Sequence, residues 1–226
     1  MNKSIIYTFI KWLVRFVLFF FSLIFIILLL TKWINPPITT VILSESISLD
    51  QKVNQEWKTI DKIGKNVILT VLASEDSNFC THYGFDFNEI FRAKEKGFSR
   101  GASTISQQVS KNLILWRERS WFRKGLEALI TIMIETLWSK KRILEIYLNI
   151  AETGNGYFGI QAISNSLFKK NSYDLTLKEA SYIAVTLPNP KKRNAKKLSI
   201  NLKKRAESVR NGANTLRLDG RASCVL

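Results

Sequence analysis

Residues 75–86 read EDSNFCTHYGFD, and residues 101–112 read GASTISQQVSKN. The first stretch directly follows the largely apolar run Val67–Ala73. Such a run predicts a buried helix, which here would end by presenting the carboxylate of Glu75. Glu75 and Asp76 are neighbours, so on a helix their side chains would point about 100° apart. We therefore expect only one of the two to take part in chemistry; a pair of ordinary solvent-facing acids is the alternative.

The second stretch predicts a helix N-terminus suited to an anion. Thr104 and Gln107 form a Thr-x-x-Gln capping box, which predicts a helix that runs to about Leu115. Ser103 adds a hydroxyl beside this N-terminus, and helix N-termini attract anions. Gln107 and Lys111 are four residues apart and share a helix face. These groups favour a sugar diphosphate as ligand, and a capped helix with an exposed polar face is the alternative.

A charged strip is expected on the next helix. Residues 121–138 repeat apolar side chains at helical spacing. Lys124 and Glu135 differ by about 20° around such a helix, and Glu127 lies within about 80° of both. Arg123 precedes this set. Ion pairing within the helix is the alternative explanation of the strip.

The remaining sequence also favours helices. Ser139 can cap a helix that runs through Asn149. Thr176 and Glu179 form another capping box, for a helix expected to stop at Leu187 before a Pro-Asn-Pro sequence. Strands have little support anywhere. We expect a single mainly α domain, preceded by a linker and a lead-in helix with a weak helical period near residues 48–60.

A membrane anchor is predicted near the N-terminus. Phe16–Leu30 is broken only by Ser22, and counting from Trp12 the stretch has nineteen positions with one charge, Arg15. A helix needs about 20 residues to cross a bilayer. A signal peptide is the alternative, but the following sequence TKWINPP has no small-x-small cleavage site. We favour an uncleaved anchor that ends at the prolines.

The basic residues predict the orientation of this anchor. Lys3, Lys11 and Arg15 lie on its N-terminal side, which favours a cytoplasmic N-terminus and an exported remainder. Of the net charge of +16, these residues carry three, leaving +13 on the exported part. Outside the cytoplasm such an excess favours anionic lipid head groups or a diphosphate over nucleic acid. The basic run at residues 191–197 is expected to be a solvated face, with lipid contact as the alternative.

The cysteines and the histidine exclude several classes of site. Cys80 and Cys224 are too few and too far apart to indicate a disulfide framework, so we expect two isolated thiols. His82 is the only histidine. Neither a zinc cluster nor a Ser-His-Asp triad therefore has its usual sequence signature.

Four stretches together resemble the signature motifs of the peptidoglycan glycosyltransferases, the membrane enzymes that polymerise lipid II into glycan strands. Residues 75–86 match the pattern E-D-x-x-F-x-x-H-x-G-x-D, and residues 101–112 match G-x-S-T-x-x-Q-Q-x-x-K-N, at every specified position. Residues 123–135 match R-K-x-x-E with a second Glu eight residues on, and residues 139–149 match S-K-x-x-I-L-E-x-Y-L-N. The resemblance covers roughly residues 67–190, is to the monofunctional members of the family, and implies a lysozyme-like fold.

The resemblance also implies a chemistry. Glu75 is expected to be the general base, and Glu127 to orient cations or assist departure of the diphosphate. The residues expected to bind substrate are Ser103, Thr104, Gln107, Gln108, Lys111, Arg123, Lys124 and Lys140. The sequence requires no cofactor, although Mg²⁺ or Mn²⁺ at the diphosphate is compatible with it. The expected partners are lipid II, the nascent glycan strand, membrane lipids and other proteins of cell wall synthesis and division, with no nucleic acid.

The expected organisation has four segments. Residues 1–35 form the cytoplasmic N-terminus and anchor, 36–66 the linker and lead-in helix, 67–210 the glycosyltransferase domain, and 211–226 a tail of unknown role. The protein is expected in the inner membrane with a single span and its catalytic domain on the periplasmic or outer side. A membrane-anchored lysozyme-like peptidoglycan hydrolase and a non-catalytic glycan-binding scaffold are the alternatives.

Overall fold

The computed structural model describes residues 3–50, 52–95, 97, 101–118 and 120–226. The chain divides after Pro36 into two compact units. The N-terminal unit is the helix α1 (Lys3–Thr31) and the residues that follow it. By length and composition, its segment Ser4–Thr31, in which an 18-residue window has a mean hydropathy of 3.0, is suited to crossing a membrane. The expected apolar helix is therefore present and is compatible with a membrane anchor.

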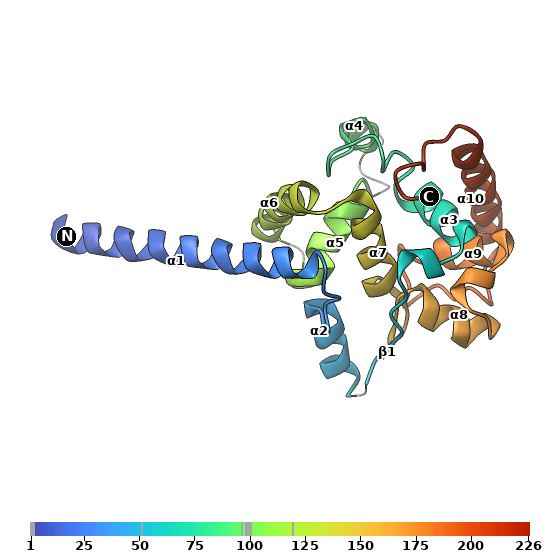
Figure 1. The fold of residues 1–226 in the computed structure, drawn as a ribbon, viewed down its shortest axis with the longest axis horizontal. Coiled ribbons are helices and arrows are strands. Elements are labelled where there is room, and N and C mark those ends of the chain that lie inside the picture. The colour runs from blue at the N-terminus through green and yellow to red at the C-terminus, as the bar shows by residue number, and fades with distance from the viewer. Residues whose placement is uncertain (1–2, 51, 96, 98–100, 119) are drawn as a thin grey trace. The chain divides into compact units, whose positions relative to one another are not determined.

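The second unit, residues 37–226, is mainly helical, so the predicted fold class is confirmed (Figure 1). In chain order its elements are α2 (Thr40–Leu49), β1 (Asn54–Gln55), η1 (Ile60–Lys62), α3 (Lys65–Glu75), α4 (Phe87–Glu95), α5 (Ile105–Ile114), α6 (Trp121–Leu137), α7 (Lys140–Ile150), β2 (Glu152–Gly154), β3 (Tyr157–Phe158), α8 (Ile160–Phe168), η2 (Ser172–Asp174), α9 (Leu177–Ala184) and α10 (Ile200–Leu218). The segment borders at residues 66 and 210 stay predictions.

Two groups of helices hold the site in place. α5 packs against α6 and α7, while α3 packs against α9 and α10. The apolar residues of α7, among them Ile143, Leu144 and Leu148, are fully buried. Burial of side chains of this size stabilises a fold by about 1.5–3 kcal/mol each. The ends of α3 and α5 are thus fixed by packing on several sides.

The predicted caps are present. Thr104 and Gln107 form a complete capping box at the start of α5. Ser139 caps α7, and Thr176 with Glu179 caps α9. The helix α9 ends at Ala184, three residues before the end predicted at Leu187. Hydrogen-bonded turns follow it up to the prolines, which cannot extend a helix.

The segment before α3 differs from the prediction. A helix was expected near residues 48–60, but α2 covers Thr40–Leu49 and ends where Asp50 adopts a left-handed conformation with φ of 48°. Beyond it, β1 pairs in parallel with β3, and β2 pairs with β3 in the antiparallel sense. These three strands had little support in the sequence, because strands of two or three residues are too short to show alternation.

The C-terminal residues form part of the packed unit. α10 passes through residue 211 without a break, and Ala213, Leu216, Ala222 and Val225 are buried. Cys224 forms a disulfide with Cys80, across a sequence separation of 144 residues. The prediction of two isolated thiols was wrong, because a pairing over this distance depends on where α10 returns to α3 and leaves no local pattern.

Candidate active site

A cleft of about 920 Å³ lies within the second unit. Its walls come from the end of α3, the start of α5, the turns after α9 and one face of α10. Five of the predicted site residues line it, namely Glu75, Ser103, Thr104, Gln108 and Lys111. Residues 75–86 and residues 101–112 therefore meet at one cavity.

Glu75 is the last residue of α3 and is partly buried in the cleft wall. Its Oε2 accepts a hydrogen bond from Nε2 of Gln108 at 3.1 Å, and its Oε1 accepts one from Oγ of Ser74 at 3.3 Å. The hydroxyl of Tyr147 donates to the other end of the same amide, Gln108 Oε1, at 3.4 Å. Burial, then the charges of Glu75 and Asp76, raise the pKa of Tyr147 well above its ordinary value. Tyr147 therefore stays a donor, which fixes the way Gln108 faces Glu75.

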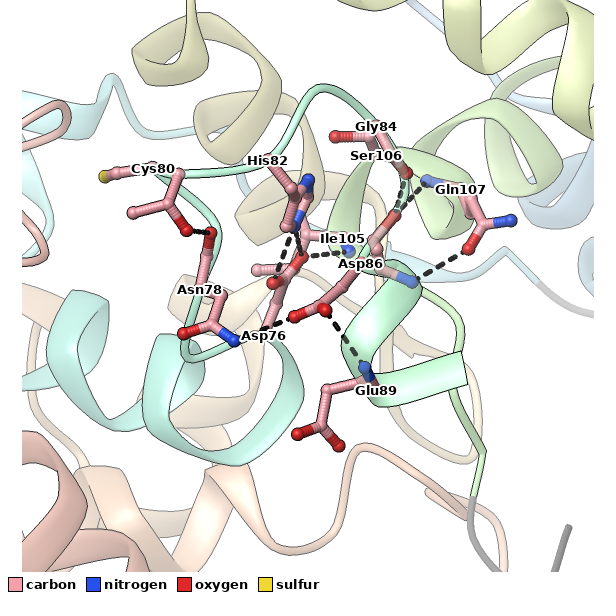
Figure 2. Close-up of polar contacts among 12 residues, drawn as sticks. Asp76, Asn78, Cys80, His82, Gly84, Asp86, Glu89, Ile105, Ser106 and Gln107 are labelled. Atoms are coloured by element: carbon pink, nitrogen blue, oxygen red, sulfur yellow. Dashed lines mark hydrogen bonds and ion pairs between the residues drawn. The ribbon is translucent and has the colours of Figure 1, made fainter. Parts of the chain in front are cut away.

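Asp76 is more deeply buried than Glu75, and Figure 2 shows its polar contacts. Its side chain is buried, and Oδ2 accepts the backbone N–H of Ile105 at 2.9 Å. Nε2 of His82 lies 2.9 Å from its other oxygen. Both acids line the cleft, but the buried carboxylate of Asp76 is taken up by these contacts and joins the end of α3 to the first residue of α5.

The loop after α3 is held by further hydrogen bonds (Figure 2). Asn78 Nδ2 donates to Asp86 Oδ2 at 2.8 Å, and Oδ1 of Asp86 caps α4 by accepting the Glu89 amide at 3.0 Å. Oγ1 of Thr104 donates to the carbonyl of Gly84 at 2.7 Å. Burial alone would raise the pKa of Asp86, but its hydrogen bonds with Glu89 and Asn78, together with the charge of His82, lower it. These hydrogen bonds therefore fix the loop against α4 and α5.

The start of α5 supplies another polar part of the cleft wall. Ser103 is exposed and Thr104 is buried in the cap. Gln107 is also buried, and its Oε1 accepts the amide of Thr104 at 3.0 Å, so it supports the wall without lining the cleft. Lys111 follows one helical turn later, and burial is the largest cause of its lowered pKa, opposed by the charge of Glu127. A cation held in a partly dry wall interacts strongly with an entering anion.

The predicted strip on α6 is present. Nη1 of Arg123 lies 2.6 Å from Glu127 Oε2, and Nζ of Lys124 lies 2.5 Å from Oε1. Glu127 is almost completely buried by these contacts. Lys124 remains partly exposed, and its Nζ also donates to Oγ of Ser103 at 3.2 Å. Ion pairing within the helix, which was the alternative explanation of the strip, therefore occurs. In addition, Lys124 contacts the cleft wall at Ser103.

Lys140 is separated from this group. Its Nζ lies 2.7 Å from Glu135 Oε1, which also accepts Oγ of Ser106 at 2.5 Å. The same ammonium lies 4.5 Å from the ring centroid of Phe79. Lys140 is not among the residues that line the cleft, and these contacts join α7 to the α3–α4 loop. Its role toward substrate stays a prediction.

The sequence did not predict a second charged cluster at the cleft. Arg117 lies 2.7 Å from Glu45 and 3.0 Å from Glu152, and Lys191 lies 2.7 Å from Glu45. Burial is the main cause of the raised pKa of Glu152, and the charge of Arg117 opposes it. Arg193 and Arg205 also line the cleft. These residues come from α2, β2, the turns and α10, so no local spacing indicated them.

The acidic residues offer little to a metal ion. Within the described part of the chain, no group of three His, Cys, Asp or Glu side chains is arranged to hold one. Asp76 and Asp86 already accept hydrogen bonds from the protein. Mg²⁺ usually takes one or two carboxylates together with substrate phosphates. Any such ion would therefore depend mainly on oxygens of its ligand.

Comparison with known proteins identifies the class of this chain. Residues 42–214 match the model of the Transglycosylase family. The chain is 40% identical over 214 residues to the biosynthetic peptidoglycan transglycosylase of Jannaschia sp. (strain CCS1), covering 95% of this chain and 89% of that relative. It is 41% identical over 228 residues to the protein of that name from Mannheimia succiniciproducens, covering 96% and 93%. A Haemophilus influenzae relative of that name is 44% identical over 188 residues, 78% of each chain. The chain belongs to the transglycosylase family.

Proposed function

We propose that this protein polymerises lipid II into the glycan strands of peptidoglycan. The observation that carries the proposal is the position of Glu75, which lines the same cleft as Ser103, Thr104 and Lys111. Family membership and the names of the relatives support this substrate and reaction.

The proposed reaction joins two lipid-linked sugars. The 4-hydroxyl of the acceptor lipid II attacks the anomeric carbon of the growing, diphosphate-linked glycan. Glu75 accepts the hydroxyl proton while the new glycosidic bond forms, since a neutral hydroxyl is a weak nucleophile. The bond between the anomeric carbon and the diphosphate oxygen breaks, and undecaprenyl diphosphate departs with the electron pair. Gln108 orients Glu75 through the 3.1 Å hydrogen bond.

The cations are proposed to bind the departing diphosphate. Lys111 lines the cleft, and Lys124, which is not among the lining residues, donates a hydrogen bond to Ser103, which is. Fixed charges of this kind stabilise developing negative charge without reorganisation during the reaction. Glu127 holds Lys124 and Arg123 in place by the two ion pairs. Mg²⁺ or Mn²⁺ on the diphosphate remains compatible with this arrangement.

The location proposed is the inner membrane, with the N-terminus in the cytoplasm and the cleft outside it. The apolar helix Ser4–Thr31 and the basic residues near its start support this topology. A reporter fused after Leu226 should be active only outside the cytoplasm. Cytoplasmic activity, or a mature protein about 30 residues shorter because of cleavage by a signal peptidase, would contradict the assignment.

One experiment separates polymerisation from the two alternatives. Purified full-length protein is incubated with lipid II, and in parallel with finished peptidoglycan. Glycan strands from lipid II alone support the proposal. Release of fragments from finished peptidoglycan would indicate a hydrolase, and binding without turnover of either would indicate a scaffold.

A further inference from the structure

The disulfide Cys80–Cys224 joins the end of the chain to the loop that follows Glu75. Cys80 lies five residues after Glu75, and Cys224 is two residues before the C-terminus. The two Cα atoms are 5.7 Å apart. Nothing in the reaction proposed above uses these sulfur atoms.

The loop that carries Cys80 determines how the two cleft walls meet. Asp76, at its start, accepts the Ile105 amide of α5, and Thr104 donates to Gly84 near its end. A displacement of this loop would therefore move the start of α5 relative to Glu75. Misplacement of reacting groups by about 1 Å can reduce a rate by about 10²-fold.

The C-terminal segment that carries Cys224 is itself anchored. Ala222 and Val225 on either side of it are buried. Nη1 of Arg221 approaches Oδ1 of Asn78 at 3.5 Å, and Asn78 donates to Asp86 in the same loop. The helix α10, from which this segment continues, packs along α3. The disulfide therefore joins the loop to an anchored segment.

From these contacts we infer that residues 219–226 are a clasp, closed by the Cys80–Cys224 disulfide, that positions Glu75 against the start of α5. Closure removes two protons and two electrons from the two thiols. A disulfide oxidant of the exported compartment accepts them by thiol–disulfide exchange and becomes a dithiol. The inference rests on the export and the activity proposed above. Cys224 is exposed, so a dithiol reductant can reach the bond.

The test compares the full-length parent in detergent before and after reduction with dithiothreitol, at a temperature where circular dichroism shows both forms folded. The parent is expected to have no free thiols after denaturation. On reduction, kcat for lipid II polymerisation should fall about tenfold or more, and by a larger factor than KM rises, because residues 219–226 do not line the cleft and act through the position of Glu75. Hydrogen exchange of residues 76–86 and 101–112 should rise. Reoxidation should restore both.

Two variants separate the clasp from general effects of the reductant. Cys224→Ser should reproduce the reduced parent and be insensitive to dithiothreitol, whereas Ser223→Ala, next to it and exposed, should behave as the parent. Two free thiols in the exported parent would overturn the inference. So would reduced protein and Cys224→Ser that keep both the parental kcat within about twofold and the parental hydrogen exchange. An inactive oxidised parent would instead contradict the proposed function, and hydrogen exchange would still test the clasp.

Discussion

Gln108 donates a hydrogen bond from Nε2 to Oε2 of Glu75 at 3.1 Å, linking the first turns of α5 to the last residue of α3. Its Oε1 accepts the hydroxyl of Tyr147 at 3.4 Å. A single amide therefore connects three helices at the carboxylate that we assign as the base. The orientation of the Gln108 amide is fixed because Tyr147 donates to its oxygen and Glu75 accepts from its nitrogen.

Gln108→Ala should reduce kcat for lipid II polymerisation by about tenfold to 10²-fold, because Glu75 loses the contact that orients it. KM should change little if Gln108 acts mainly through Glu75. Tyr147→Phe should have a smaller effect, since it removes only the more distant, 3.4 Å contact. Steady-state kinetics of the two variants beside the parent test this, and a larger loss in KM than in kcat for Gln108→Ala would assign Gln108 to substrate binding alone.

Lys124→Ala should reduce polymerisation by about 10²–10³, because it removes a cation beside the developing charge. Its thermal unfolding should stay close to that of the parent, as Lys124 is partly exposed. Lys140→Ala is the comparison for stability. It leaves the buried Glu135 without its cation, so stability should fall by about 3 kcal/mol. Rates within about twofold of the parent for Lys124→Ala would show that this lysine is an ordinary surface charge.

Asp86→Ala should lower the free energy of unfolding by about 1 kcal/mol at neutral pH, because it removes the cap of α4. The native pKa of Asp86 is lowered, so its charge stabilises the fold above the unfolded pKa of about 3.9. That contribution is lost as the pH falls through the lower native value. Denaturant unfolding of the full chain at several pH values should show the parent and Asp86→Ala approaching each other in acid.

Asp86→Asn is the control for the charge. It keeps an oxygen that can cap α4 and loses the titrating group, so its difference from the parent should be complete above about pH 4 and disappear as the pH falls through the lowered native pKa of Asp86. A difference for both variants that is constant from neutral to strongly acidic pH would show that ionisation of Asp86 does not stabilise the fold.

Local signals in the sequence predicted much of this structure. The capping box of Thr104 and Gln107 depends on residues three apart, so its geometry can be read from spacing alone. The apolar run before Glu75 predicted a buried helix with an acid at its end, and α3 has that form. The fold class followed because the apolar side chains recur at helical spacing from α3 onward.

The features that were missed are tertiary. The Cys80–Cys224 bond and the Arg117 contacts with Glu45 and Glu152 join residues from distant parts of the chain. Their pairing depends on helix packing, which spacing along the sequence does not reveal. Lys140 shows the reverse case, since a motif grouped it with substrate-binding residues while its contacts are with Glu135 and Phe79.

The most direct test of the central claim is the rate of lipid II polymerisation by Glu75→Gln. The amide has nearly the size of the carboxylate but cannot take the proton from the 4-hydroxyl of the acceptor lipid II, so the rate should fall by about 10²–10⁴. Thermal unfolding should be unchanged, and Glu127→Gln should differ by weakening donor binding as well as rate. Near-parental polymerisation by folded Glu75→Gln would contradict the assignment of Glu75 as the general base.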